Sequence, residues 1–520
     1  MSRPSTELDL LARRARATPD RLALVDVETG EESTYRELDR AVDAVSGELD
    51  RAKGDVDSRG FEGLEDDGIA TLLPTGGPFV RVAFAAFRTG STLVPLGPNE
   101  STTTLVKACD AVRPGTLVCA SSTADLALAV ADRASVDRVV SIEPVSSASI
   151  TSIDGGDPAN APPPTPIGGD DVALVPFTSG TGGRPKGVRL TMDNLLASAR
   201  RSAYRLGVEP DDRWLDPLGV HHRGGFAPIV RSTLYGTTVL TQQEFSAERT
   251  AATVERHEAT VVSLVPPMVK QMLDRGWEPA EELRVALVGG AAASPTLVED
   301  ALDAGVPIYP TYGTTETSSQ VATATPAQSA RHPGVVGRPL FEVDVTIVDD
   351  AGVSLPAGET GRIRVCGPIV AAGYLDDRDG SGTFEDGCIH TGDRGVLDAD
   401  GRLWITGRES DRIVTGGETV DPNVVRAVLA AHPAVESAFV VGLADEKWGE
   451  RVGAVVVPTD HEPRSSVESI EDHCRGRLAA HERPRIVADV DALPRTVSGT
   501  VDRDAVRSIL RERGDSTWAE

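Results

Sequence analysis

Two patterns of hydrophobic and polar positions alternate along the first part of the chain. ELDRAVDAVSGELDRA (37–52) spaces its apolar residues at the helical period, whereas IATLLP (69–74) is a short continuous apolar run typical of a buried strand. Similar runs bounded by Gly, Pro or Asp follow at 171–177, 259–266, 284–290, 343–349 and 361–367, and a helix is expected at 194–205. This alternation predicts an α/β fold, with a large N-terminal domain of mixed sheets layered with helices.

The pattern changes at two places. A stretch rich in Ser, Pro and Gly at 143–171 predicts an exposed connection. After Arg408 the pattern restarts on a smaller scale, with Asp421 as the expected N-cap and Pro422 as the first residue of a helix. Val424, Val425, Val428 and Leu429 are expected on one face of that helix, and two strands (436–443, 451–458) and a helix (467–481) follow. We therefore expect domains at 1–408 and 409–520, the second a small, mobile α+β domain.

Composition narrows the class of protein. A chain of 520 residues exceeds the size of one hydrophobic core. No apolar run is long enough to cross a membrane, and the first residues do not resemble a secretory signal, so the expected location is the cytoplasm. The formal net charge of -27 argues against general affinity for nucleic acid. This acidity, with only five Lys among the 52 basic residues, is typical of a salt-adapted proteome.

The five cysteines are Cys109, Cys119, Cys366, Cys388 and Cys474, and none has C-x-x-C spacing. The sequence thus indicates neither a zinc site nor a disulfide framework, and isolated buried thiols are expected.

The segment FTSGTGGRPKGV (177–188) directly follows an apolar run and combines hydroxyl side chains, four glycines and Lys186. Small residues let backbone N–H groups approach an anion, hydroxyls add donors, and a Lys supplies charge for a polyphosphate. The segment lacks the Gly-Lys-Ser/Thr ending of the Walker loop. It predicts phosphate binding by a different loop.

This loop resembles the signature of the acyl-adenylate-forming (AMP-binding) superfamily, which includes acyl-CoA synthetases, luciferases and peptide-synthetase adenylation domains. The superfamily's other motifs follow in order: HHRGGF (221–226), LVGGAAAS (287–294), YPTYGTTETSSQ (309–320), HTGDRG (390–395) and GRESDRIVTGGETVDP (407–422). An ordered set across nearly 250 residues is very specific. The resemblance implies ATP-dependent adenylation of a carboxylic acid with Mg²⁺, followed by transfer of the acyl group to a thiol.

The resemblance also implies roles for individual residues. Those implied to be catalytic are Lys186, Thr315, Glu316 and Arg408, with Glu316 also holding Mg²⁺. Those implied to bind ATP are Thr178, Ser179, Gly180, Thr181, Gly182, Gly183, Gly289, Gly290, Ala291, Tyr312 and Asp393. Tyr312 would stack on adenine, and Asp393 would accept hydrogen bonds from the ribose hydroxyls.

Two positions depart from the superfamily pattern. The pivot about which the small domain rotates corresponds to Ser410, where Asp or Lys is more usual. In LPRTVSGTVDR (493–503), Thr500 occupies the position of a Lys that completes the adenylation site. Arg495 and Arg503 lie nearby in sequence and are candidate substitutes, although Arg and Lys differ in geometry.

Closer resemblances to particular ligases indicate which thiol accepts the acyl group and which carboxylic acid is activated. The chain resembles aryl and acyl-CoA ligases at Gly416, Gly417, Trp448, Arg483 and Arg485, which implies that these residues bind coenzyme A. The phrases at 305–325 and 336–345 are most similar to the 2-succinylbenzoate–CoA ligases of menaquinone biosynthesis. By position, His222, Gly313 and Ser318 would border the acyl pocket. Candidates for holding a second carboxylate are Arg223, Arg231, Ser319 and Gln320.

Three hypotheses stay open at this point. The first is the 2-succinylbenzoate ligase, and the second is another aryl or medium-chain acyl-CoA synthetase. The third, motivated by Thr500, is an adenylate-binding protein with impaired adenylation. Homologues commonly pair, so a homodimer is an expectation that no segment of the sequence locates.

Overall fold

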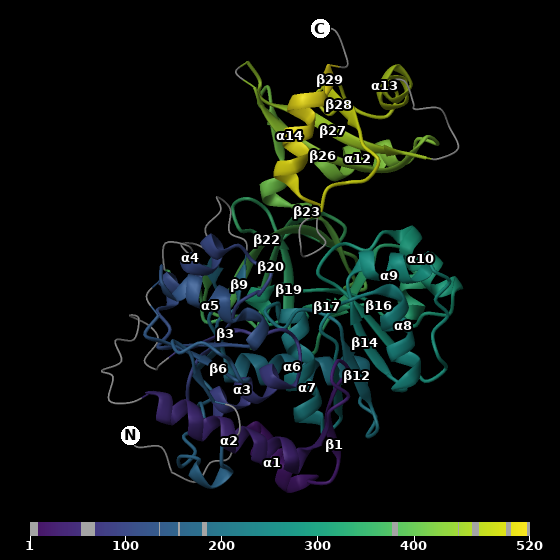
Figure 1. Cartoon of the computed structure of the whole chain (residues 1–520). Coiled ribbons are helices and arrows are strands. Elements are labelled where there is room, and N and C mark those ends of the chain that lie inside the picture. Colours follow the sequence, from purple (N-terminus) through teal and green to yellow (C-terminus); the bar gives the residue numbers. More distant parts are fainter. Residues whose placement is uncertain are drawn as a thin grey trace. The chain divides into compact units, whose positions relative to one another are not determined.

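The computed structural model describes residues 9–53, 68–134, 136–153, 156–178, 185–376, 383–445, 447–459, 467–495 and 501–516. The chain divides into two compact units (Figure 1). The first consists of Met1–Thr346, Arg364–Thr391 and Asp398–Trp404, and the second of Ile347–Ile363, Gly392–Leu397 and Ile405–Glu520. The expected boundary between residues 408 and 409 and the rotation about Ser410 stay predictions.

A seven-stranded sheet forms one part of the first unit, in the order β11, β8, β4, β3, β5, β6, β7. Its strands are β3 (Ile69–Leu72), β4 (Leu93–Pro95), β5 (Thr116–Cys119), β6 (Arg138–Ser141), β7 (Thr151–Ser152), β8 (Val172–Leu174) and β11 (Leu190–Thr191). All neighbours pair in parallel except β8 and β11. The four residues of β3 and of β5 are all buried, which matches their continuous apolar runs.

A second sheet of 14 strands has the order β19, β20, β22, β23, β18, β17, β16, β15, β14, β12, β13, β1, β2, with β21 beside β22. Its first strands are β1 (Leu22–Asp26), β2 (Glu32–Thr34), β12 (Arg213–Asp216), β13 (Thr238–Thr241), β14 (Val261–Leu264), β15 (Val285–Val288) and β16 (Ile308–Tyr312). The others are β17 (Ala322–Thr323), β18 (Val335–Pro339), β19 (Asp344–Val348), β20 (Thr360–Cys366), β21 (Phe384–Glu385), β22 (Cys388–Leu397) and β23 (Leu403–Arg408). From β1 through β13, β12, β14 and β15 to β16 the strands are parallel.

Helices cover both sheets of the first unit in layers. The central layer comprises α1 (Leu10–Ala17), α2 (Tyr35–Lys53), α3 (Gly77–Arg88), α6 (Met192–Leu206) and α7 (Arg223–Tyr235), whose apolar faces share one core with strands of both sheets. On the seven-stranded sheet, α4 (Thr102–Val112) and α5 (Ala124–Ala131) form a second core. Against the longer sheet, α8 (Ala247–Arg256), α9 (Pro266–Leu273) and α10 (Pro295–Asp303) form a third. Short α11 (Pro326–Arg331) follows β17.

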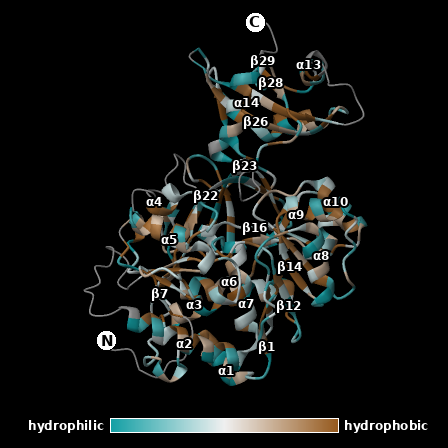
Figure 2. Ribbon diagram, viewed as in Figure 1, coloured by the Kyte–Doolittle hydropathy of each residue, from teal (hydrophilic) through white to brown (hydrophobic). Residues whose placement is uncertain are grey.

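The apolar surface of the strands lies inside these layers. Figure 2 shows hydrophobic ribbon concentrated in the strands, with hydrophilic ribbon on the outer helices. In the central layer, Phe226 of α7 makes edge-to-face contacts with Phe79 and Phe87 of α3. The expected α/β fold of the large domain is thereby confirmed.

The second unit contains a six-stranded sheet. Its strands are β24 (Ile413–Thr415), β25 (Glu418–Val420), β26 (Val435–Asp445), β27 (Gly449–Pro458), β28 (Ile486–Asp489) and β29 (Asp515–Ser516). One face packs against α12 (Pro422–Ala430) and α13 (Val467–Arg475), and α14 (Arg503–Arg513) packs in a separate core with β26, β27 and β28. The α+β character expected for the small domain is confirmed.

The local predictions for α12 and α13 are confirmed with two corrections. Asp421 accepts a hydrogen bond from the Asn423 N–H at the start of α12. Val425 and Leu429 are buried, but Val424 is 46% exposed, because it lies one position away from the buried stripe of the helix. The helix expected at 467–481 ends at Arg475, directly before Gly476.

The Ser-, Pro- and Gly-rich stretch at 143–171 is more than an exposed connection. Within it, β7 adds to the edge of the seven-stranded sheet, and Ile150 and Ile153 are buried. The expectation was wrong here because two isolated isoleucines among polar residues give no periodic signal, although each has a core to enter.

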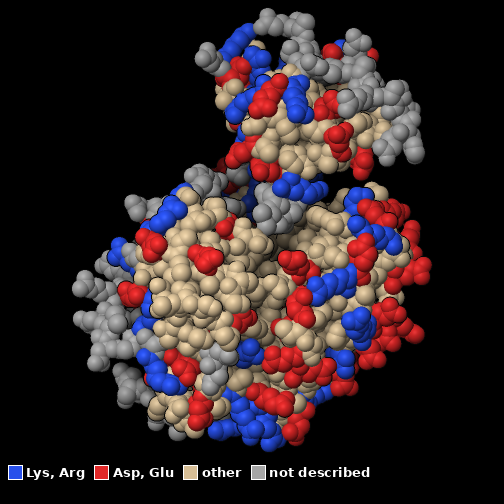
Figure 3. Space-filling view, in the orientation of Figure 1, with Lys and Arg blue, Asp and Glu red and all other residues tan. Residues whose placement is uncertain are grey.

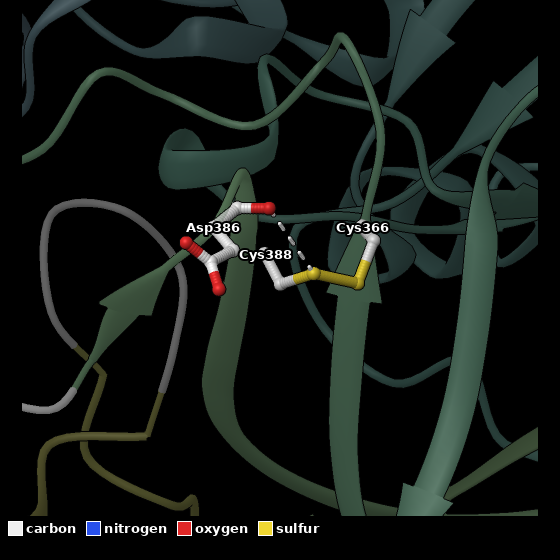
Figure 4. Close-up of a disulfide and its surroundings, with 3 residues drawn as sticks. All are labelled: Cys366, Asp386 and Cys388. Carbon is white, nitrogen blue, oxygen red and sulfur yellow. Dashed lines mark hydrogen bonds between the residues drawn. A yellow bond between two sulfur atoms is a disulfide. The ribbon is translucent and has the colours of Figure 1, made fainter.

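A disulfide joins Cys366 of β20 to Cys388 of β22 (Figure 4). The expectation of isolated thiols was therefore wrong for this pair and right for Cys109, Cys119 and Cys474, which are free and buried. The two residues are 22 positions apart, and only the neighbouring positions of β20 and β22 in the sheet bring them together. Cys388 Sγ also lies 3.8 Å from the carbonyl oxygen of Asp386, a contact and no hydrogen bond because a disulfide sulfur has no hydrogen to donate.

Surface charge agrees with the composition. On the face shown in Figure 3, acidic side chains gather over the edge that carries α8, α9 and α10, with basic side chains among them. In the described part of the chain, no helix is both long and apolar enough to cross a membrane.

Candidate active site

The carboxyl ends of two parallel strands carry some of the residues that the sequence singled out. Gly289 and Gly290 follow β15, and Gly313 follows β16, the next strand of the sheet. Ligands of open parallel sheets bind at this edge because the loops there open away from the sheet. Gly290 has φ +78°, which favours glycine, and a Cβ at Gly289 would lie 2.7 Å from the Thr311 methyl group. Small residues are therefore required where the adenine is expected.

The phosphate loop is described only at its two ends. Thr178 of β9 (Phe177–Thr178) pairs with Lys186 of β10 (Lys186–Gly187) in a two-stranded antiparallel ribbon. Ser179, Gly180, Thr181, Gly182 and Gly183 lie outside the described residues, so their roles stay predictions. The Lys186 ammonium group lies 5.0 Å from the centroid of the Tyr374 ring, within the range of a cation–π contact.

Tyr374 also binds the expected magnesium ligand. Its hydroxyl donates to one carboxylate oxygen of Glu316 at 2.9 Å, and the backbone N–H of Ala371 donates to the Glu316 carbonyl at 2.8 Å. Glu316 and Thr315 lie on the short helix η3 (Thr315–Thr317), where both are half-buried. One tyrosine thus connects Lys186 with Glu316, so a cation for phosphates and an anion for a metal are held together.

These groups fit a magnesium ion bound together with phosphates. In the described part of the chain, no three His, Cys, Asp or Glu residues cluster as a metal site. Mg²⁺ in nucleotide sites is usually held by one or two carboxylates and by substrate phosphates, so one carboxylate suffices. Glu316 would hold the ion, which would neutralise charge on the phosphates when bound.

The remaining nucleotide residues occur in two sets. In the first unit, Tyr312 at the end of β16 is buried, and its hydroxyl donates to Thr391 Oγ1 at 3.0 Å. In the second unit, Asp393 is 5% exposed and accepts a hydrogen bond of 3.0 Å from Nε of Arg408, which is exposed. Ala291 is exposed in the loop after β15. Convergence of both sets on one nucleotide stays a prediction.

The residues expected to bind coenzyme A lie in the second unit. Trp448 is 45% exposed, and a Cβ at Gly416 would lie 2.8 Å from its ring. Gly416 and Gly417 both have positive φ in the turn between β24 and β25. Arg483 donates to the carbonyl oxygens of Leu478 and Arg475. The half-buried Arg485 follows closely, and the CoA-binding role of all five residues stays a prediction.

The structure shows the contacts of Arg503 and Arg495, the two candidate substitutes for the missing lysine. Thr500 lies outside the described residues. Arg503 makes a two-pronged ion pair with Asp411, on the short helix η5 (Glu409–Asp411) that contains Ser410. Its guanidinium also lies 6.0 Å from the Phe439 ring centroid. Arg503 is thus engaged within the second unit, whereas Arg495 lies in an isolated bridge with Val501.

The expected acyl pocket has a tightly folded wall. A Cβ at Gly313 would overlap the carbonyl oxygen of Ser319, so only glycine allows this approach. Ser318 and Ser319 both have positive φ, which is strained for serine. Ser198 of α6 donates to the Ser318 carbonyl at 2.6 Å and holds this conformation from the central helix layer.

His222 precedes α7 and differs from its neighbour. The His222 side chain is exposed, yet the surrounding protein desolvates it and lowers its pKa. A side chain that solvent reaches while protein surrounds most of it is typical of the wall of a pocket. The ring centroids of His221 and His222 are 4.1 Å apart, and burial, with a smaller effect of His222, lowers the pKa of His221 to about 3.

A group of buried polar residues lies beside this wall. We call Asp216, Arg223, Arg231, Gln242 and Ser318 the buried polar cluster; each is at most 5% exposed. Each has at least one buried side-chain nitrogen or oxygen without a hydrogen-bond partner among the described residues. Such groups are rare in protein interiors because an unpaired buried polar atom is destabilising. The cluster is therefore a candidate ligand site.

Several of these residues had not been expected. Tyr374, Asp216 and Gln242 gave no motif signal in the sequence, and Thr391 lies in the motif HTGDRG without having been assigned a role. Tyr374 donates a hydrogen bond to Glu316, and Thr391 accepts one from Tyr312, so the partners are about 60 to 80 positions apart in the sequence. The one available signal for Asp216 was an acid directly after the apolar residues of a strand.

Comparison with known proteins identifies the family. The model of the "AMP-binding enzyme" family matches residues 11–375, and that of the "AMP-binding enzyme C-terminal domain" matches residues 425–500. The chain belongs to the AMP-binding enzyme family. The resemblance inferred from the ordered motifs is thereby confirmed.

Curated relatives of this AMP-binding enzyme include 2-succinylbenzoate–CoA ligases. That of Bacillus cereus (strain Q1) is 32% identical over 505 residues, which cover 96% of this chain and 98% of the relative. That of Bacillus subtilis (strain 168) is 38% identical over 336 residues, which cover 64% of this chain and 68% of the relative. The resemblance to this group of ligases is also confirmed.

Solved structures agree with the fold. The o-succinylbenzoate CoA synthetase of Bacillus subtilis in complex with the acyl-adenylate intermediate OSB-AMP has a TM-score of 0.83 and 31% identity, covering 98% of this chain and 99% of that chain. The same enzyme in complex with ATP and magnesium ion has a TM-score of 0.81. The amide bond synthetase McbA from Marinactinospora thermotolerans has a TM-score of 0.82 and 29% identity, covering 96% and 98% of the two chains.

Proposed function

We propose that this AMP-binding enzyme is a 2-succinylbenzoate–CoA ligase of menaquinone biosynthesis. It adenylates the acid with ATP and Mg²⁺, releases pyrophosphate and transfers the acyl group to coenzyme A. The observation that carries the proposal is the Glu316 carboxylate held by Tyr374, whose ring also contacts Lys186. A carboxylate and the α-phosphate of ATP are both anions, so a fixed cation and a bound metal are what their reaction requires.

The substrate assignment is supported by the relatives. Two proteins of that name match the chain at 32% and 38% identity, the first over nearly its whole length. Because McbA shares the fold at nearly the same TM-score, the fold alone does not decide the acceptor. Coenzyme A is favoured by Gly416, Gly417 and the exposed Trp448.

ATP–pyrophosphate exchange with a panel of acids at high salt tests the first half-reaction. We expect exchange with 2-succinylbenzoate and none with benzoate or fatty acids. Chromatography should then show a CoA thioester when CoA is present and a retained adenylate when it is omitted. Exchange with simple benzoates or medium-chain acids would instead support another aryl or medium-chain acyl-CoA synthetase.

An adenylate-binding protein with impaired adenylation stays the third candidate, because Thr500 replaces the usual Lys and Arg503 is engaged with Asp411. The variant Thr500→Lys tests it. An increase in exchange rate of about tenfold or more would show that the missing cation limits the enzyme, because a positioned charge contributes on that scale. An unchanged rate would show that another group supplies the charge.

Three further parts of the proposal are supported only by the sequence. These are a cytoplasmic location, adaptation to high salt and a homodimer. Activity that rises with KCl concentration, and a mass of twice 54.7 kDa by light scattering, would support the last two.

A further inference from the structure

Two aromatic side chains lie together on the surface of the first unit. Tyr204 is 77% exposed and Phe341 is 55% exposed, which makes them the two most exposed aromatic residues among those that the structure describes. Their ring centroids are 5.1 Å apart and their planes are inclined by 28°, so the rings stack on each other. Exposed apolar side chains are normally scattered singly, and those that gather in one place mark interaction sites. We call Tyr204 and Phe341 the exposed ring pair.

Contacts from α6 hold both segments that carry the ring pair. Arg201 of α6 forms an ion pair with Glu342, and Nη2 of Arg205 donates to the backbone carbonyl of Arg338 at 3.1 Å. These two contacts lie on either side of Phe341 in the sequence. The rings are therefore fixed in place without a partner, and a surface that is already ordered loses little entropy when it binds.

The turn after β18 directs Phe341 outward. Leu340 and Val343 are buried, whereas Phe341 and Glu342 between them are exposed. The Val343 N–H donates to the Leu340 carbonyl at 3.0 Å, and Glu342 has φ +54°, which is strained for a residue other than glycine. Exposed turn positions usually carry Gly, Pro, Asn, Asp or Ser. Folding alone does not require an apolar ring at this position, so we attribute it to binding.

Charged side chains of both signs occur in the segments around the ring pair. Arg200 lies one helical turn before Tyr204 on α6, Arg338 belongs to β18, and both are exposed. Neither of these two arginines forms an ion pair with another described residue. Glu209, just after α6, and Asp344, at the start of β19, are exposed as well. A surface with both signs around an apolar centre is complementary to a second copy of itself across a two-fold axis.

The charge of the chain favours a second copy over other partners. A formal net charge of -27 opposes approach to an anionic membrane or to nucleic acid, and Glu209 and Asp344 would face the same anions. Two copies of the chain also repel each other, but salt removes that repulsion, because the Debye length is about 3 Å at 1 M. The apolar contact between rings does not depend on charge and persists under those conditions.

We propose that the exposed ring pair is the centre of a two-fold interface between two copies of this chain. Around it, the exposed arginines of one copy face the exposed carboxylates of the other. This inference rests on the homodimer of the proposed function and deepens it, because it locates the interface. Aromatic residues at the centre of an interface carry a large share of the affinity, and each ring occurs twice in a two-fold contact.

Sedimentation equilibrium of the full chain over a dilution series in about 1 M KCl tests the role of the rings. Wild type should show twice the chain mass of 54.7 kDa and dissociate on dilution. Tyr204→Gln and Phe341→Asn should each raise the dissociation constant by about 30-fold or more, the scale of an interface hot spot. Gln suits a helix and Asn suits a turn with positive φ, so both variants should keep the thermal unfolding of the monomer.

Arg338→Glu tests the charged part of the interface without changing the rings. We expect the dissociation constant to rise about tenfold at 0.1 M KCl, where the Debye length is about 10 Å, and to rise less at 1 M. Two variants outside the surface are matched controls. Val353→Ser removes an exposed apolar side chain between β19 and β20, and Arg16→Glu reverses an exposed arginine of α1. Both controls should dissociate as wild type does.

The outcomes separate the interface from the homodimer and from the ligase activity. If wild type is a dimer and both ring variants stay dimers, the inference is overturned and the homodimer stands. If wild type is a monomer throughout, the homodimer and the inference are both overturned. Cosedimentation of a monomeric wild type with phosphatidylglycerol vesicles, lost in the ring variants, would assign the surface to lipid and overturn the inference. Dissociation of the ring variants alone supports it.

ATP–pyrophosphate exchange on the same samples tests the ligase activity independently. Neither ring belongs to the residues placed at the nucleotide or at the acyl pocket, so the ring variants should exchange at the wild-type rate per chain. A wild type that forms the dimer and exchanges with no acid would overturn the ligase assignment and leave the interface standing.

Discussion

Tyr312 and Asp216 end two strands of the same sheet, β16 and β12, yet the polar side chains near these two residues differ in how fully they are hydrogen-bonded. Among the nucleotide residues, Tyr312 bonds Thr391, and Tyr374 bonds Glu316 while contacting Lys186. In the cluster, two buried nitrogens of Arg223 have no hydrogen-bond partner in the described part of the chain. The catalytic groups are thus held by protein contacts before a ligand binds. Some polar atoms of the buried polar cluster, by contrast, make no such contacts within the described residues. Chemistry shared by a family needs preorganisation, and specificity for one acid needs unsatisfied donors that only this acid completes.

The sharpest test of this contrast is the stability of the two arginine variants without ligand. Arg231→Met removes the cation beside Asp216 and the bond to Ser319, so we expect a loss of about 3 to 5 kcal/mol in the free energy of unfolding. Arg223→Met removes a buried charge without a partner and should raise stability by about 1 to 3 kcal/mol. Urea denaturation of both variants measures the difference. Equal losses would contradict the distinction between the two arginines.

On the nucleotide side, Glu316→Gln keeps an oxygen that accepts the Tyr374 hydroxyl and removes the negative charge. We expect adenylation to fall by about 100- to 1,000-fold, the range for loss of one electrostatic catalytic group. ATP–pyrophosphate exchange over a magnesium titration measures this loss. Thermal unfolding should match wild type, which separates a catalytic from a structural role.

The disulfide tests how firmly β22 is held. This strand carries Thr391, the partner of Tyr312, and a bridge over 22 positions is expected to contribute about 2 to 4 kcal/mol. The double variant Cys366→Ser, Cys388→Ser should unfold at lower urea concentration and bind ATP more weakly. Cys109→Ser, at a buried free thiol, is the control for the loss of a sulfur atom. Intact-mass analysis after alkylation should give three reactive thiols in unfolded wild type.

Tyr374→Phe isolates a single hydrogen bond. Phe keeps the ring beneath Lys186 and removes the hydroxyl that donates to Glu316. A hydrogen bond to a charged group is worth about 1.5 kcal/mol at the low end, so exchange should slow by roughly tenfold. A rate equal to that of wild type would show that Glu316 needs no support from Tyr374.

A last test concerns acid stability, where the effect near neutral pH is small and grows only as the pH falls. Burial first, and then His222, lowers the pKa of His221 to about 3 from 6.5 in the unfolded chain. The unfolded chain therefore binds more protons between these values, so stability falls as the pH falls from 6.5 toward 3. His221→Phe should reduce the slope of stability against pH in this window. An unchanged slope would mean that other groups cause the acid sensitivity.

The sequence by itself determined the layered α/β fold, the second α+β unit and the family. Those features depend on periodicity, on turn residues and on motifs that are continuous along the chain, such as Asp421 with Pro422 before α12. Glu316 and Lys186 were identified in the same way. Local physics dictates these features, so they are visible without a fold.

Tertiary structure alone decided which distant groups meet. The pairing of Cys366 with Cys388 requires β20 and β22 to be neighbours, and Tyr374 reaches Glu316 only through the fold. In the sequence, Arg223 and Arg231 are equal candidates for a second carboxylate. They differ because Trp214 and Asp216 of β12 and Ser319, which follows β16, all interact with Arg231. Burial and charge balance are sums over neighbours in space, and a linear pattern does not contain them.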